Sequence, residues 1–179
     1  HDIWNYDNPT APVLMNVTVD GQPTPIVVQT TKQGWAYTFN RESGEPIWPI
    51  EEREVPQSDL PGEKLSPTQP FPTRPLAYDM QGLTEDDLID YTPELRQEAL
   101  EIIKNYKIGP IFNPPIQVDH PSGLRSFVLC PSGATNIYGP TTADPETGIL
   151  YVSSRTGCRS ENIVSGRLKD DPDDVKTTG

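Results

Sequence analysis

The stretch that decides the fold runs from His1 to Trp48, and its two most informative pieces lie at its ends. These pieces are His1-Asp2-Ile3-Trp4-Asn5-Tyr6-Asp7 and Asn40-Arg41-Glu42-Ser43-Gly44-Glu45-Pro46-Ile47-Trp48. Between them, residues 13–19 and 24–30 are short, rich in apolar and β-branched side chains, and bounded by Pro and Asp-Gly, which is typical of strands. Asp20-Gly21 accepts the positive φ values of a tight turn, so these two strands are predicted to form a hairpin. Residues 35–40 and 45–48 are predicted as a third and a fourth strand, and four short antiparallel strands make one β-propeller blade.

The closing piece resembles a repeat of the PQQ-dependent (quinoprotein) dehydrogenases, the tryptophan-docking motif Ala-x-Asp-x-x-Thr-Gly-Lys-x-x-Trp. Gly44 and Trp48 match this motif, Ser43 stands for its Thr, and Asn40 stands for its Asp. The chain departs from the motif at residues 38 and 45. Residues 66–71, Ser-Pro-Thr-Gln-Pro-Phe, also resemble the branch that contains membrane-bound glucose dehydrogenase. The resemblance implies a mainly β fold, a partial β-propeller of antiparallel four-stranded blades cut from an eight-bladed parent.

The opening piece resembles a second segment of the same family, His-Asp-x-Trp-Asp-x-Asp, whose Asp after the Trp is the catalytic base. His1, Asp2, Trp4 and Asp7 match this segment, and Asn5 stands at the position of the base. About one hairpin later the family places a Lys or Arg that hydrogen-bonds the quinone, and Lys32 in Thr-Lys-Gln-Gly matches the glucose-dehydrogenase form. The resemblance therefore implies Asn5 and Asp7 as catalytic positions and Lys32 as a cofactor-binding residue. Some members also use an Asp at the position of Asp7 as an additional metal ligand.

Oxidation of an alcohol by a quinone needs a base for the hydroxyl proton, a donor to polarise the quinone carbonyl, and a cation to hold both. The compact ammonium of Lys32 suits the donor role, and its structural alternative is a solvated hairpin lysine. The carboxamide of Asn5 is not basic at neutral pH and can only orient a substrate or a water molecule. Asp7 is a nearby carboxylate, and its structural alternative is to cap a backbone N–H.

The resemblance implies a fragment of a PQQ-dependent dehydrogenase that acts on the CH–OH groups of a sugar or an alcohol and is inactive as an isolated slice. The parent would use PQQ and Ca²⁺, pass electrons to a quinone or cytochrome acceptor, and reside in the periplasm, either soluble or as a domain of a membrane protein. The slice itself is expected to hold neither group tightly, because the family's Ca²⁺ ligands and stacking Trp have no match in it. The alternative is a non-catalytic propeller or binding module that lost the base, with Asn5 in its place.

The rest of the chain divides into three expected regions, after a first blade over residues 1–49. Residues 50–115 combine a Pro-rich extended connection with a helical insertion, residues 116–158 return to propeller strands, and residues 159–179 form a polar, frayed tail. The later strands are expected at 125–130, 136–143 and 149–153. Asp144-Pro145-Glu146-Thr147-Gly148 repeats the pattern of the turn at residues 40–44, which suggests a recurring blade.

The helical insertion carries two N-terminal signals. Thr84 precedes three acidic residues, and Thr92 precedes Pro93 at the first helical position. An apolar stripe then follows at helical spacing, and Gly109-Pro110 is predicted to end the helix. The stripe consists of Leu95, Ala99, Ile102, Ile103 and Tyr106. It could be a partner site, but packing on the propeller rim is the preferred interpretation.

Composition limits the size of the core and the kinds of partner that the chain can have. Hydrophobic residues make up 34% of the chain, and there are 21 prolines among 179 residues, so a large self-sufficient core is not expected. A slice of a propeller explains this and predicts self-association through exposed blade edges. The net charge of −12 excludes nucleic acid as a partner, since such a surface repels phosphate. Cys130 and Cys158 are interpreted as free thiols in preference to a mutual disulfide, which would support an oxidising compartment.

Overall fold

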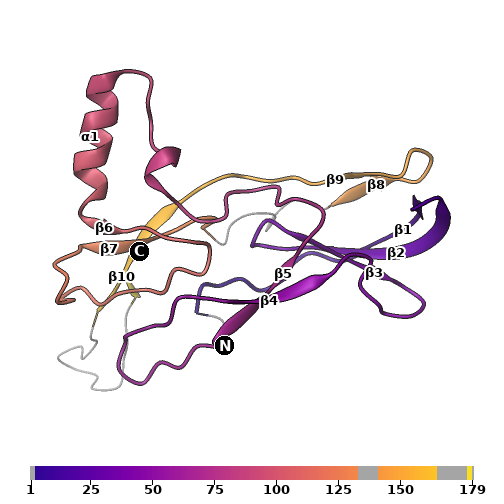
Figure 1. Ribbon diagram of the computed structural model, residues 1–179, viewed down its shortest axis with the longest axis horizontal. Coiled ribbons are helices and arrows are strands. Elements are labelled where there is room, and N and C mark those ends of the chain that lie inside the picture. Colours follow the sequence, from indigo (N-terminus) through magenta and orange to yellow (C-terminus); the bar gives the residue numbers. More distant parts are fainter. Residues whose placement is uncertain (1–2, 133–140, 165–176, 179) are drawn as a thin grey trace.

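The computed structural model describes residues 3–132, 141–164 and 177–178, and within them the chain is mainly β with one short α-helix (Figure 1). The elements are β1 Val13–Val19, β2 Gln22–Thr30, β3 Ala36–Asn40, β4 Ile50–Glu54, β5 Thr68–Pro72, the 3₁₀ turn η1 Glu85–Asp87, α1 Pro93–Ile103, β6 Tyr106–Lys107, β7 Ser126–Leu129, β8 Thr142–Asp144, β9 Ile149–Tyr151, β10 Arg159–Ile163 and β11 Thr177–Thr178. The sheets have the orders β1-β2-β3, β11-β10-β7-β6, β4-β5 and β8-β9. The first part of the strand predicted at 136–143 and most of the predicted tail lie outside the described residues. The start of that tail was predicted wrongly as frayed, because residues 159–163 form β10 and pair with β7.

The predicted hairpin is confirmed. β1 pairs antiparallel with β2, from Val13 opposite Val28 to Val19 opposite Gln22. The two-residue loop has φ values of 49° and 79°, both positive, as a type I′ turn requires and as Asp-Gly readily supplies. β3 then pairs antiparallel with β2 and completes a three-stranded sheet.

The predicted fourth strand at residues 45–48 is wrong, because this segment makes only isolated pairings with β3. Pro46 forms a single bridge with Phe39, and the Ile47 N–H donates to the Thr38 carbonyl oxygen at 2.9 Å. Pro46 and Pro49 have no N–H to donate, so a regular ladder cannot extend through them. The blade is therefore a three-stranded sheet with a bridged edge segment.

The Pro-rich connection is also more ordered than its composition indicates. β4 and β5 pair antiparallel over five residues each, from Ile50 opposite Pro72 to Glu54 opposite Thr68. Proline is tolerated here because β4 and β5 form a two-stranded sheet in which each strand is an edge. The prediction of an extended connection without packed secondary structure was wrong for these two segments.

The two turns related by sequence have the same structure, as their shared pattern predicted. The Asn40 side-chain oxygen accepts from the backbone N–H groups of residues 42 and 43 at 2.9 and 3.2 Å. Asp144 accepts from those of residues 146 and 147 at 2.9 and 3.4 Å. Gly44 and Gly148 close the turns with φ values of 79° and 71°. The second turn joins β8 to β9, and this hairpin lies beside β1.

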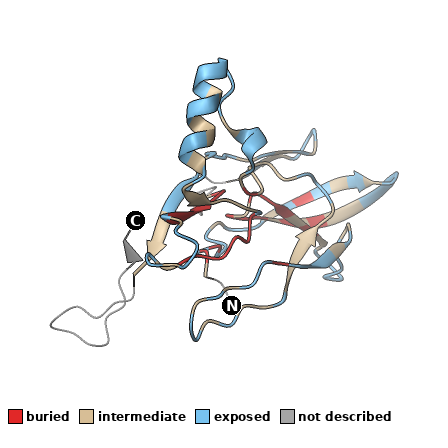
Figure 2. Cartoon of the chain, turned by 60° about the vertical axis from the view of Figure 1, so that its left-hand side comes forward, coloured by how far each residue is buried: buried red, intermediate tan, exposed pale blue. Residues whose placement is uncertain are grey.

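The helix forms where it was predicted, but it ends earlier, and its side chains are more exposed to solvent than expected. The Thr92 hydroxyl caps α1 by accepting from the Leu95 N–H at 3.3 Å. α1 ends at Ile103, and Tyr106 already belongs to β6, so Gly109-Pro110 is not the stop. No residue of α1 is buried, and Leu95 and Ile102 are 40% and 53% exposed. The described residues leave much of the apolar stripe uncovered, and Figure 2 shows α1 projecting from the buried centre, so its packing on the propeller rim stays a prediction.

The core lies where segments far apart in the sequence meet, shown in red in Figure 2. Aromatic rings dominate it, and the ring centroids of Trp4 and Phe112 are 5.1 Å apart, while those of Trp35 and Phe71 are 5.0 Å apart. Residues 111–116 form an irregular loop in which every residue is buried. A buried loop needs partners for its backbone carbonyls, and side chains from other segments supply several of them.

Two further expectations need correction. Cys130, at the end of β7, and Cys158, just before β10, form a disulfide with a Cα–Cα distance of 4.6 Å, so the preferred interpretation as free thiols was wrong. The described strand pairs are antiparallel except β6 with β7, which pair in parallel over two residues, so the expectation of purely antiparallel sheets was too strict. The disulfide and the parallel strand pair both lie in the second half of the chain.

Candidate functional site

The site begins with a short extended segment, residues 4–7, whose side chains alternate between the core and the surface. Trp4 and Tyr6 are 2% and 5% exposed and point into the core. The Trp4 Nε1–H donates to the Asn113 carbonyl oxygen at 2.8 Å. The Tyr6 hydroxyl is 2.9 Å from the Pro131 carbonyl oxygen and 3.2 Å from that of Ile111. The two aromatic side chains therefore satisfy backbone carbonyls of buried or nearly buried segments and fix the position of the segment that they belong to.

Asn5 and Asp7 occupy the alternate positions and are exposed. Asn5 has a φ of 64°, which lies in the left-handed region. Asn and Asp enter this region more readily than other residues with a Cβ, because their short polar side chains hydrogen-bond locally. The backbone at this position therefore tolerates either a carboxamide or a carboxylate.

Lys32 lies on the tight turn between β2 and β3. The Gly34 N–H donates to the Thr31 carbonyl oxygen at 3.1 Å, and Gly34 has a φ of 81°. A Cβ at Gly34 would lie 2.8 Å from the Asp79 Cβ, so both the backbone conformation and the space require glycine. The turn directs Lys32 into the protein, where the residue is only 5% exposed.

The Lys32 ammonium lies between the two exposed side chains of the first segment. Its Nζ donates to Asp7 Oδ1 at 2.5 Å and to Asn5 Oδ1 at 3.2 Å. An ammonium has three N–H donors, and the described residues provide no third partner for it. The Lys32 hydrogen bond holds the pKa of the Asp7 carboxyl below its usual value of 3.8, and the neighbouring positive charge acts in the same direction. The arrangement is a largely buried cation, with one N–H donor that no described residue accepts, next to an ionised carboxylate and a carboxamide.

Comparison with known proteins identifies the family to which the chain belongs. The sequence profile of the family described as "PQQ: Glucose/ethanol/alcohol dehydrogenase, beta-propeller domain" matches residues 1–176. The chain belongs to this PQQ-dependent dehydrogenase family. Among curated relatives, it is 38% identical to the quinoprotein glucose dehydrogenase of Escherichia coli (strain K12) over 192 aligned residues, covering 100% of this chain and 22% of that protein. It is 30% identical to the glycerol dehydrogenase large subunit of Gluconobacter oxydans (strain 621H), covering 95% of this chain and 22% of that protein.

A quinate/shikimate dehydrogenase (quinone) of Acinetobacter baylyi is 28% identical and covers 98% of this chain and 21% of its own length. The chain thus spans about a fifth of the length of these curated relatives. No solved structure matches it significantly. The resemblance to PQQ-dependent dehydrogenases drawn from the motifs is therefore confirmed.

The structure brings together three of the residues singled out from the sequence: Asn5, Asp7 and Lys32 form one hydrogen-bonded cluster. His1 and Asp2 lie outside the described residues. Trp48 lies apart from the cluster, where it lines a pocket of about 430 Å³ against the three-stranded sheet and the β8–β9 hairpin. The roles that the family motif assigns to the cluster remain predictions.

A PQQ site would need more than the described residues offer. Among them, no group of three or more His, Cys, Asp or Glu side chains is arranged to hold a metal ion, so Asp7 alone does not make a Ca²⁺ site. Trp4 and Trp35 are buried in the core and present no open face for a planar cofactor to stack on. In this cluster, the Lys32 ammonium is a charged donor that fits a quinone oxygen.

Sequence reasoning missed the residues that support the cluster. Tyr6 and Asn113 were not singled out, although both connect the first segment to the buried loop. Gln33 was quoted only as part of the Thr-Lys-Gln-Gly motif. The alternation of aromatic and polar residues in positions 4–7 was an available signal, since successive side chains of an extended segment point to opposite sides.

Among the residues that the structure describes, no helix has both the length and the apolar character that a bilayer-spanning segment requires.

Proposed function

We propose that the chain is a section of a larger PQQ-dependent dehydrogenase that oxidises a sugar or an alcohol, and that the section is inactive in isolation. The observation that carries the proposal is the Lys32 ammonium, which is buried and held at 2.5 and 3.2 Å from Asp7 and Asn5. These are the positions at which the family motif has its cofactor lysine, a further Asp and its base. Relatives named for glucose, glycerol and quinate support a CH–OH substrate. We further propose that the electrons pass to a quinone or a cytochrome.

When bound, PQQ supplies a quinone that accepts two electrons from the substrate. Lys32 would hold it through the ammonium N–H that lacks a partner among the described residues. Because the residue is 5% exposed, water screens this charge weakly, and its interaction with a developing negative charge is correspondingly stronger. Ca²⁺ ligands and a stacking surface would come from other parts of the larger protein.

Proton acceptance is the step in which this chain departs from the family motif. The Asn5 carboxamide cannot accept a proton, but its NH₂ group can orient a substrate hydroxyl or a water molecule. Asp7 is ionised at neutral pH, and its lowered pKa makes it a weaker base than an unpaired carboxylate. We therefore propose that Asp7 mainly orients the Lys32 ammonium, and that a group outside the described residues, or Asp7 at reduced rate, accepts the proton.

The second candidate is a propeller module that binds without catalysis. The observation that favours it is Asn5 itself, which accepts from Lys32 at 3.2 Å at the position of the base. Such a carboxamide stabilises the turn without proton chemistry. The two candidates differ in one measurable property, which is turnover by protein loaded with PQQ.

Two further proposals concern the setting of the protein. The disulfide between Cys130 and Cys158 supports an oxidising compartment such as the periplasm. The exposed apolar residues of α1, together with uncovered sheet edges, support self-association of the isolated chain. Analytical ultracentrifugation of the isolated chain should show oligomers, and a monodisperse monomer would contradict this proposal.

The test of the main proposal uses the full-length protein, prepared without cofactor and reconstituted with PQQ and Ca²⁺. Reduction of a dye acceptor is followed with a panel of sugars and alcohols, and samples lacking PQQ serve as the control. We expect turnover that depends on PQQ with at least one substrate. Demonstrated PQQ binding without turnover on any substrate would favour the binding module. Absence of PQQ binding would overturn both the assignment of PQQ as cofactor and the proposed dehydrogenase activity.

A further inference from the structure

We propose that Gln33 is a positioning residue of the Lys32 site. Its side-chain amide joins the turn that carries Lys32 to the segment that carries Asn5 and Asp7. The consequence for catalysis rests on the proposed function above, whereas the structural link does not.

The link is a hydrogen bond from the Gln33 Nε2 group to the Tyr6 carbonyl oxygen at 3.2 Å. Tyr6 lies between Asn5 and Asp7 in the sequence, so this bond acts at the centre of the segment that contacts Lys32. The chemistry of the partners fixes the orientation of the amide. A carbonyl oxygen can only accept, and only the NH₂ end of the Gln33 side chain can donate.

The same turn is also held from its other side. The Gln81 Nε2 group donates to the Gln33 backbone carbonyl oxygen at 2.7 Å, and Gly34 packs closely against Asp79. The turn is therefore anchored to the segment around residue 80, and the Gln33 side chain ties this anchored unit to residues 5–7. Loss of the side-chain amide would leave the turn in place and remove the direct link between the turn and the first segment.

The other end of the amide indicates a requirement beyond packing. Gln33 Oε1 is buried and has no hydrogen-bond partner among the residues that the structure describes. Rotating the amide would turn this oxygen towards the Tyr6 carbonyl oxygen and lose the link. A buried unpaired acceptor is unfavourable, and such atoms persist in folded proteins where another requirement fixes the group. The link to Tyr6 is that requirement.

The ion pair alone does not hold the cluster together. The Asp7 side chain is 60% exposed, so water competes with Lys32 for the carboxylate and limits the contribution of the ion pair. The lysine side chain is also long and flexible, so its Nζ needs a fixed frame to remain 3.2 Å from Asn5 Oδ1. Gln33 supplies that frame by fixing the distance between the two backbones.

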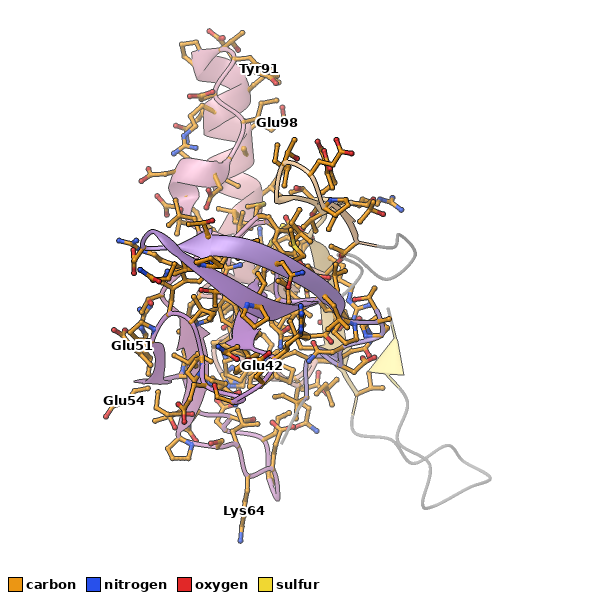
Figure 3. All side chains as sticks on the ribbon, turned by 90° about the vertical axis from the view of Figure 1, so that its right-hand side faces the viewer. Glu42, Glu51, Glu54, Lys64, Tyr91 and Glu98 are labelled. Carbon is orange, nitrogen blue, oxygen red and sulfur yellow. A yellow bond between two sulfur atoms is a disulfide. The ribbon has the colours of Figure 1, made fainter. Side chains whose placement is uncertain are left out.

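The test is lysine acetylation of the cofactor-free full-length protein, with the rates at individual lysines measured by mass spectrometry. Gln33→Met removes the donor with little change in volume. We expect it to raise the acetylation rate of Lys32 about fivefold, which corresponds to one hydrogen bond of ordinary strength. The exposed Lys64, which projects into solvent in Figure 3, and the partly buried Lys107 serve as internal references and should keep their rates.

The matched control is Gln57→Met. Gln57 also donates its side-chain amide to backbone carbonyls, those of Val55 at 3.0 Å and Ser66 at 3.3 Å, but lies outside the site. Gln57→Met should leave the acetylation rate of Lys32 unchanged. Gln33→Leu, which also removes the donor and adds no charge, should behave as Gln33→Met does. An unchanged Lys32 rate in both Gln33 variants, or equal increases at Lys32 and Lys107, would overturn the proposal.

Kinetics then separate this proposal from the proposed function. In an active full-length enzyme, Gln33→Met should lower kcat about tenfold or more with little change in KM, because misplacement of a catalytic group acts on the chemical step. A wild-type protein without PQQ-dependent turnover would contradict the proposed function and leave the acetylation result standing. An active wild type with a fully active Gln33→Met would refute the positioning role.

Discussion

Replacing Lys32 by Met separates the catalytic contribution of the ammonium from its contribution to the fold. Met fills a similar volume and is flexible enough to occupy the path of the lysine stem. Asp7 is 60% exposed and Asn5 is also exposed, so water replaces the lost donor at both. The cost in folding free energy should therefore stay within the range of an exposed ion pair, about 0 to 1 kcal/mol.

The effect on turnover should be far larger. Removing one preorganised donor from the site of a developing negative charge typically lowers kcat by about 10² to 10³. We expect Lys32→Met in the full-length, PQQ-loaded protein to lose activity by this factor. Its thermal midpoint should shift by no more than about 2 to 4 °C. The assays are dye reduction under saturating substrate and thermal denaturation of the same preparations.

The control is Lys107→Met. The Lys107 Nζ donates to the Pro114 carbonyl oxygen at 2.9 Å, so this lysine is also partly buried and bonded, but to the core loop and not to the site. It should alter stability more than turnover. Activity of Lys32→Met within about twofold of the wild type, or a loss of folding larger than that of Lys107→Met, would refute the assignment of Lys32 to the cofactor.

The remaining predictions concern the base position, pH and the disulfide. If Asn5 replaces a lost base, Asn5→Asp in the full-length enzyme should raise kcat by about 10² to 10⁴, whereas an unchanged or lower kcat would mean that another group already accepts the proton. Because Lys32 lowers the pKa of Asp7, their pair stabilises the fold above the unfolded value of 3.8, and this contribution is lost as the pH falls through the lower folded value. The stabilities of wild type and Asp7→Asn, measured by denaturation, should therefore differ at about pH 6 and approach each other as the pH falls below 3.8, and a constant difference would contradict this linkage. Replacing Cys130 and Cys158 by Ser should lower the free energy of unfolding by about 3 to 4 kcal/mol, the chain-entropy value for a loop of this length, and an unchanged denaturation midpoint would show that the bridge does not form.

Local signals in the sequence predicted the local structure well. The positive φ values at Asp20-Gly21 follow from residues that readily adopt them, and the turns at 40–44 and 144–148 form because an Asn or Asp side chain accepts from the next backbone N–H groups. The strand pair β4–β5 was missed because proline was taken as evidence against strands. Proline is compatible with a two-stranded sheet in which both strands are edges.

Features that depend on tertiary contacts were not predictable in the same way. A separation of 28 residues gives no information on whether two cysteines meet, and the disulfide depends on how β7 and β10 pair. The period of α1 indicated an apolar stripe but not what covers it. In the site, the family motif identified Lys32, Asn5 and Asp7, whereas Gln33 emerged only from the distance between its amide and the Tyr6 carbonyl oxygen.

The most direct test of the central claim is an experimental structure of the full-length protein with PQQ bound. The account predicts a quinone oxygen within about 3.2 Å of the Lys32 Nζ, the upper limit of an N–H···O hydrogen bond, with Asn5 and Asp7 on the same side of the cofactor. PQQ bound elsewhere, with the Lys32 ammonium still held only by Asn5 and Asp7, would contradict it.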